Sequence, residues 1–117
     1  MKYQELLDGL LKIEGIQGAF LLNNDGAKVV ESFREQKDFT PFYSIAQNST
    51  LINQQFAALF NHGIFMQGNL EFEDDFLTIE PTPGKQVLVV VAKSGSNVGR
   101  IRLEMKRVRK QMEEGSA

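Results

Sequence analysis

The stretch IEGIQGAFLLNNDG, residues 13–26, contains the signals that decide the fold. Its first two glycines interrupt a helical pattern, and the apolar run from Gly18 to Asn23 is typical of a strand. Asp25-Gly26 follows at once. An Asp-Gly pair between two apolar runs is the strongest short-range hairpin signal, because both residues tolerate positive φ. The stretch therefore predicts the end of a helix, a strand, and a tight turn into a second strand at Lys28–Phe33.

The segment before this stretch has helical spacing. Tyr3, Leu6, Leu10 and Ile13 recur at steps of three and four, which predicts an opening helix that ends at the glycines. After the hairpin, residues 34–39 are polar and charged and are expected to form a loop.

Thr40-Pro41 marks the start of a long second helix that is expected to run to about Asn61. A threonine hydroxyl can accept a hydrogen bond from a free N–H group at a helix start, and proline suits the first helical position. An apolar stripe can bury one face against a sheet: Phe42, Ile45, Ile52, Phe56 and Leu59. Beside it, a line of smaller side chains ending in a phenylalanine would let another helix approach closely: Ala46, Thr50, Asn53, Ala57 and Phe60.

Two further strands are expected after this helix. Leu70 and Phe72 mark the first, and the alternation of apolar and polar residues at Phe76–Glu80 marks the second. Asp74-Asp75 is expected to form the turn between them, and Pro81–Gly84 the turn that follows.

The segment QVLVVVA, Gln86–Ala92, is apolar on both faces. Such a pattern indicates a central strand covered on both sides, so we expect Val89 to be buried. A strict three-four repeat then predicts a last helix that ends near Glu114: Val98, Ile101, Met105, Val108 and Met112.

The order helix, two strands, helix, three strands, helix indicates an α/β domain with one five-stranded antiparallel sheet and helices on both faces. A chain of 117 residues fits a single domain. We expect this domain at residues 1–114 and a disordered tail at residues 115–117.

Composition disfavours several classes of function. The formal charge is −2 and the pI about 5.4, whereas nucleic-acid binders usually have a strong basic excess. Without cysteine there are neither disulfides nor thiolate metal sites. The longest aliphatic run, residues 87–92, is far too short to span a bilayer, and the first ten residues lack the apolar run of a signal peptide. We expect a cytoplasmic protein that binds no nucleic acid and does not insert into membranes.

Few residues could carry chemistry. The single histidine, His62, ends a predicted helix, where capping is the simpler interpretation, and neither Ser94 nor Ser96 has the context of a nucleophile. The loop at residues 94–99 could hold an anion before the last helix, although capping by Ser96 or Asn97 explains it equally well. We therefore expect no catalytic residue, no metal ligand and no cofactor, and we do not expect an enzyme.

Charges gather in two places. An acidic cluster without a calcium-loop pattern suits a soluble hairpin turn: Glu71, Glu73, Asp74 and Asp75. The last helix is basic, with six positive charges in eleven residues: Arg100, Arg102, Lys106, Arg107, Arg109 and Lys110. This helix presents either a solvated face or an electrostatic docking surface for an acidic protein partner.

Two segments resemble motifs of a known family. Residues 13–26 resemble the opening motif of the roadblock/dynein light-chain family, and NVGRIRL, residues 97–103, is similar to the family's motif at the start of its last helix. The order of elements and the length also match over nearly the whole chain. The resemblance implies a profilin-like fold. The glycines of these motifs serve geometry: Gly15 and Gly18 release the chain from helix to strand, and Gly26 makes the turn.

The resemblance also implies a function. Members of the family form homo- or heterodimers in which third strands pair edge to edge and second helices pack together, and most, MglB-like regulators among them, act on small Ras-like GTPases. We therefore expect a homodimer that binds a small Ras-like GTPase. Its interface would combine the line of small residues at Ala46–Phe60 with the apolar Leu70 and Phe72 of an edge strand. Docking on the second helix, with electrostatic steering by the last, would involve Gln47, Gln54, Ala58, Asn61 and Arg107.

Two alternatives stay open. The chain could be a ligand-sensing domain, since profilin-like folds resemble sensory domains, or a structural assembly domain of a larger complex. A small hydrolase or transferase that uses the acidic cluster at residues 71–75 is a further alternative.

Overall fold

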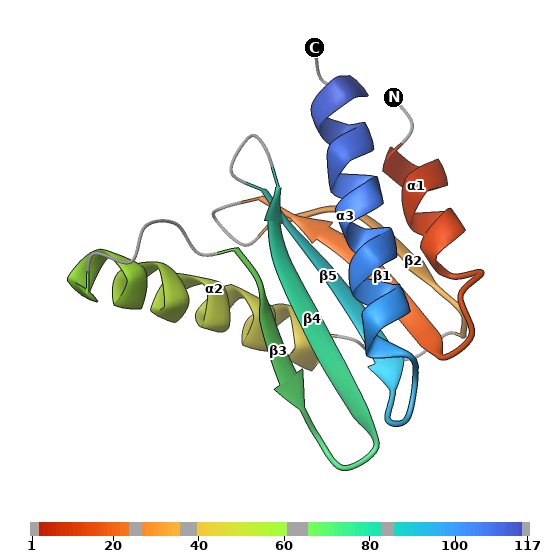
Figure 1. The fold of residues 1–117 in the computed structure, drawn as a ribbon, viewed down its shortest axis with the longest axis horizontal. Coiled ribbons are helices and arrows are strands. Elements are labelled where there is room, and N and C mark those ends of the chain that lie inside the picture. Colours follow the sequence, from red (N-terminus) through yellow and green to blue (C-terminus); the bar gives the residue numbers. More distant parts are fainter. Residues whose placement is uncertain (1–2, 24–26, 36–39, 61–65, 83–85, 116–117) are drawn as a thin grey trace.

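The computed structural model describes residues 3–23, 27–35, 40–60, 66–82 and 86–115, without the side chains at 49–50, 52–54, 56–60 and 115. The expected order of elements is confirmed (Figure 1). In chain order the elements are α1 (Tyr3–Leu10), β1 (Ile16–Leu22), β2 (Lys28–Phe33), α2 (Thr40–Phe60), β3 (Gly68–Glu71), β4 (Asp75–Thr82), β5 (Gln86–Lys93) and α3 (Val98–Gly115).

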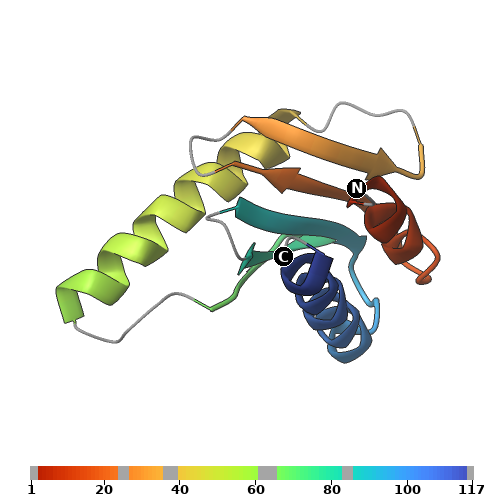
Figure 2. The same ribbon diagram turned by 90° about the horizontal axis from the view of Figure 1, so that it is seen from above.

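The five strands form one antiparallel sheet in the order β2-β1-β5-β4-β3. β5 is therefore central, and β2 and β3 are the two edges. Figure 2 shows α1 and α3 on one face of the sheet and α2 on the other. The structure thus has the expected α/β class, with a five-stranded antiparallel sheet between helices on both faces.

Two apolar layers lie between the sheet and the helices. On one face, Leu7 and Leu10 of α1 pack with Ile101 and Met105 of α3 over the sheet. On the other face, α2 covers a second layer formed by the alternate strand residues: Phe20, Leu22, Leu77, Ile79, Val87, Val89 and Val91. Val89 is completely buried, as expected for the central strand. Both faces of β5 are apolar because each faces one of these layers.

The end of α1 differs from the expectation. The helix ends at Leu10, before the glycines, and the guanidinium of Arg34 then donates hydrogen bonds to the backbone carbonyls of Leu11 and, at 2.9 Å, of Ile16. These bonds tie the segment between α1 and β1 to the end of β2. Gly15 has φ +96°, and a Cβ there would lie 2.0 Å from the Ser96 hydroxyl. Gly15 is therefore required by both backbone conformation and space.

One expectation about β4 was wrong. The strand continues through Pro81 to Thr82, where a turn was expected. Proline is tolerated there because β3 pairs only with residues 76–79, so within the described residues no strand flanks Pro81 on that side. The polar residues of the alternation, Thr78 and Glu80, are buried, since α3 packs over their side of β4.

The expected tail also needs a correction. Gly115 is the last residue of α3, because the helix continues one residue past Glu114. Residues 116–117 lie outside the described residues.

Candidate protein-interaction site

The β3 edge of the sheet is open. Phe72 N–H donates a hydrogen bond to the Asp75 carbonyl at 2.8 Å, so the backbone groups of Phe72 point towards β4. Because backbone groups of successive residues in a strand point to opposite sides, those of Asn69 and Glu71 point away from β4. Within the described chain nothing pairs with them, and the side chains of Met66 and Phe72 beside β3 are exposed. An unpaired edge flanked by apolar side chains is a template for another strand.

The outer half of α2 lies beside this open edge. The first turns of the helix pack on the sheet through Phe42, Tyr43 and Ile45. Figures 1 and 2 show the C-terminal half of α2 extending past β3 and away from the sheet. Leu51 on this half is exposed. The β3 edge and the outer half of α2 therefore form one continuous candidate site for another protein.

The structure places three of the expected interface residues, and corrects one. Ala46 was expected on the flank available to a second helix, but its side chain is completely buried in the layer between α2 and the sheet. Ala46 cannot contact a second helix, because it lies on the side of α2 that faces the sheet, as Phe42 and Ile45 do. Leu70 is half-buried against this layer, and Phe72 is 46% exposed. The remaining expected residues have side chains outside the described set: Thr50, Asn53, Ala57 and Phe60.

The expected partner-binding residues are mostly outside the described structure. Gln47 lies on α2 and is exposed. The side chains of Gln54 and Ala58 are not described, and Asn61 and His62 lie outside the described residues. Their role in binding stays a prediction. Arg107 is exposed on α3, on the opposite face of the sheet, and forms an ion pair of 3.0 Å with Glu104.

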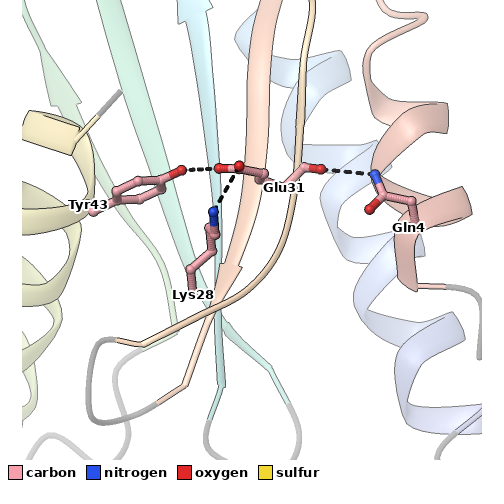
Figure 3. Close-up of polar contacts among 4 residues, drawn as sticks. All are labelled: Gln4, Lys28, Glu31 and Tyr43. Atoms are coloured by element: carbon pink, nitrogen blue, oxygen red, sulfur yellow. Dashed lines mark hydrogen bonds and ion pairs between the residues drawn. The ribbon is translucent and has the colours of Figure 1, made fainter. Parts of the chain in front are cut away.

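The opposite edge, β2, is closed by a polar network (Figure 3). Arg34 N–H donates to the Gln17 carbonyl, so the alternation along β2 turns the backbone groups of Glu31 outward. The amide of Gln4 on α1 donates to that Glu31 carbonyl at 2.9 Å. The Glu31 carboxylate accepts a hydrogen bond from Tyr43 of α2 and pairs with Lys28 at 2.9 Å. Gln4 of α1 thus covers the outward carbonyl that another strand would need, and Tyr43 of α2 holds the side chain of the same residue.

These contacts change the ionisation of two carboxyl groups. Burial alone would raise the pKa of Glu31, but the hydrogen bonds from Tyr43 and Lys28 outweigh it, so the pKa lies below its ordinary value. Hydrogen bonds from Ser32 and Gln4 likewise lower the pKa of Asp8. Both groups are held as carboxylates at neutral pH. The carboxylate of Asp8 links α1 to β2, and that of Glu31 links β2 to α2.

Sequence reasoning missed a buried ion pair beneath α3. Glu80 is 1% exposed, and its Oε1 lies 3.3 Å from Nη1 of Arg109. Burial raises the pKa of Glu80, although the positive charges of Arg109, Lys106 and Arg102 oppose the rise. Within the described residues Glu80 Oε2 and Gln67 Nε2 lack a hydrogen-bond partner. The signal was the basic flank Arg102, Lys106 and Arg109, which recurs at helical spacing next to the apolar stripe of α3.

The loop before α3 has a structural role. Asn97 Oδ1 accepts a hydrogen bond from the Arg100 N–H at 3.0 Å, so Asn97 caps the helix as one sequence interpretation proposed.

Across the described ranges, no group of three or more histidine, cysteine or acidic residues is placed to hold a metal ion. In that same part of the chain, no helix has the length and apolar character needed to cross a membrane.

The chain is similar in structure to several known proteins. It superposes on Myxococcus xanthus MglB with a TM-score of 0.86 and 22% identity, over 96% of this chain and 92% of that one. A Roadblock/LC7 domain from Streptomyces avermitilis gives 0.86 at 18% identity, over 95% and 94% of the two chains. LokiProfilin1, solved in complex with rabbit actin, gives 0.61 at 14% identity, over 95% and 93%.

These similarities settle the fold. No family model matches the sequence, and neither does any curated protein. The structure nevertheless has the roadblock fold of MglB, a profilin-like arrangement, as the opening motif led us to expect.

Proposed function

We propose that two copies of this chain pair through β3 and the outer half of α2, and that the dimer binds a small Ras-like GTPase as a regulator or scaffold in the cytoplasm. The observation that carries the proposal is the open β3 edge next to an α2 that extends beyond the sheet. The fold shared with MglB and a Roadblock/LC7 domain supports it. The GTPase itself comes from the family resemblance of the sequence.

Pairing of two β3 strands would satisfy the outward backbone groups of Asn69 and Glu71. It would also bring the exposed Met66 and Phe72 under cover, and apolar area removed from water is the main driving force for association. The two α2 helices would then lie close together on one face of a continuous sheet. The chain as described offers this arrangement at one edge only, because the β2 edge is closed by Gln4 and Glu31.

The GTPase would dock on the two α2 helices. Gln47, Gln54, Ala58 and Asn61 give this surface short, uncharged side chains, which lose little conformational entropy on docking. The proposal needs no catalytic residue from this chain. The dimer would act by holding the GTPase, and a regulator of this kind changes the rate of GTP hydrolysis by stabilising one arrangement of the GTPase's own residues.

Sedimentation tests the dimer. The wild-type protein at micromolar concentration is expected to sediment with about twice the monomer mass of 13.2 kDa. A clean monomer at that concentration would refute the paired β3 edges.

The substitution Ala58→Arg tests the docking face. It is expected to spare folding and dimerisation but to abolish binding to a GTPase from the same genome, because a long charged side chain would stand in the centre of the platform. Gln111→Arg is the matched control, since it adds the same charge to an exposed site on α3. Binding kinetics are measured with the GTPase in both nucleotide states. Wild-type binding by Ala58→Arg would exclude α2 as the docking face, and no binding in either state would favour a structural assembly domain.

A further inference from the structure

The outer face of α3 carries several positive side chains around one exposed apolar residue. Leu103, at the centre of this face, is 65% exposed. Arg100, Lys106 and Arg107 lie three or four positions away, so they surround Leu103 on the helix surface. Lys110 continues the face by one more turn. The helix therefore presents one apolar side chain inside a ring of cations.

Most of these cations have no intramolecular partner. Arg107 is balanced by Glu104 on the same helix, and Arg109 by the buried Glu80 below it. Across the described residues no carboxylate lies within ion-pair distance of the other four: Arg100, Arg102, Lys106 and Lys110. The exposed side of α3 is therefore a positive surface on a protein whose net charge is negative, although Arg102 and Lys106 also act on the buried carboxylate of Glu80 from a distance.

The geometry disfavours a membrane or a nucleic acid as the occupant. The apolar stripe of α3, which includes Ile101 and Met105, is buried in the core, so the outer face lacks the broad apolar surface that an interfacial helix inserts into lipid. The helix has no aromatic residue to stack on bases.

We propose that the outer face of α3, formed by Arg100, Leu103, Lys106 and Lys110, docks an acidic segment of a partner protein in which carboxylates flank an apolar side chain. Arg100 presents a planar fork that matches a carboxylate, the lysines add charge, and Leu103 offers an apolar contact that orders the segment. Charge complementarity selects the partner, and Leu103 adds shape to what would otherwise be a diffuse attraction.

This surface is separate from the proposed GTPase platform. α3 and α2 lie on opposite faces of the sheet (Figure 2). An acidic segment on α3 would leave β3 and α2 free, so one dimer could hold a GTPase and an acidic partner at the same time. The inference does not depend on the GTPase proposal, and either can fail alone.

A labelled synthetic peptide of about a dozen alternating Glu and Leu residues tests the proposal with the full chain. Fluorescence anisotropy should show saturable binding that weakens between about 50 and about 300 mM salt, because salt screens exposed charges. The double substitution Arg100→Glu, Lys110→Glu should raise the Kd about tenfold. Lys12→Glu, Lys93→Glu makes the same change in net charge away from this face and should bind as wild type.

Two further measurements test the chemistry of the partner. Replacement of Glu by Gln in the peptide should abolish binding, and Leu103→Ser should weaken it by about threefold without changing its salt dependence. The proposal is overturned if both charge-reversed doubles lose binding equally, if the Gln peptide binds as well, or if anionic phosphatidylserine vesicles compete for the protein better than the peptide does. Thermal melts of each variant should match wild type, since the substituted side chains are exposed.

Discussion

The two edge strands of the sheet, β2 and β3, both have outward backbone groups but differ in how the chain covers them. Each has backbone groups that point away from the sheet, at Glu31 in β2 and at Asn69 and Glu71 in β3. On β2, the Gln4 side chain of α1 donates a hydrogen bond to the outward Glu31 carbonyl. Lys28 and Glu31 also place charges on this strand, and its pairing with β1 shifts in register between Leu21 and Leu22. On β3, which also carries a charge at Glu71, no side chain of the described residues covers the outward backbone groups. Such an edge is open to pairing with another strand.

The largest expected effect is unfolding of the whole sheet, which would abolish both edge strands together. Val89→Asp places an unpaired charge in the buried strand β5, from which both halves of the sheet are built. A charge there costs several kcal/mol, enough to unfold a domain of this size. Circular dichroism should show a chain that is already unfolded at room temperature and has no cooperative melting transition. A melting temperature equal to wild type would mean that β5 is not the central strand.

A matched pair of substitutions compares the edges directly. Phe72 beside β3 and Val29 on β2 are similarly exposed, at 46% and 40%. Phe72→Lys should weaken dimerisation by about 1–3 kcal/mol, because it puts a charge into the proposed interface. Val29→Lys should leave it unchanged. Both dissociation constants come from sedimentation over a concentration series, and the comparison fails if Val29→Lys is the more damaging change.

The two sides of the sheet should also respond to pH with opposite signs. The pKa of Glu31 is lowered in the folded protein, so its contribution to stability is present above its ordinary value and is lost as pH falls through the lowered pKa. The pKa of Glu80, next to β3, is raised, so the folded state binds more protons between the ordinary value and the raised pKa. Stability from Glu80 therefore falls as pH rises through that window.

Urea denaturation between about pH 3 and about pH 7 measures these two contributions. At neutral pH, Glu31→Gln should destabilise the protein by about 1 kcal/mol through loss of the charged hydrogen bonds from Tyr43 and Lys28. Glu80→Gln should be neutral or stabilise it by about 1 kcal/mol, since it removes a buried charge and keeps the shape. Changes of the same sign in the two pH profiles would contradict the assignment.

The smallest expected effect concerns steering from the far face. Arg107→Glu should slow association with a GTPase only at low salt and by less than about threefold, because α3 lies across the sheet from α2 and Glu104 already balances Arg107. Stopped-flow kinetics at two salt concentrations separate this change from dissociation. A change in the dissociation rate instead would place Arg107 in the contact itself.

Much of the fold could be predicted because its signals are local. Asp-Gly after an apolar run, Thr40-Pro41 and the uniform apolar strand around Val89 each specify an element without reference to distant residues. The errors arose where a distant element decides the outcome. The burial of Glu80 was missed because it depends on α3 covering β4, and Ala46 was placed on a free helix flank because the pattern alone does not show how α2 lies on the sheet. The pairing of Gln4 with Glu31 joins residues 27 positions apart and has no signal in either segment.

Backbone amide hydrogen exchange over a range of protein concentrations tests most directly the claim that β3 is open and β2 is closed. If two chains pair through β3, the outward amides of Asn69 and Glu71 should become protected as the concentration rises, while the amide of Glu31 in β2 should exchange at the same rate throughout. Protection that grows with concentration at Glu31, and not at Asn69 and Glu71, would contradict the account.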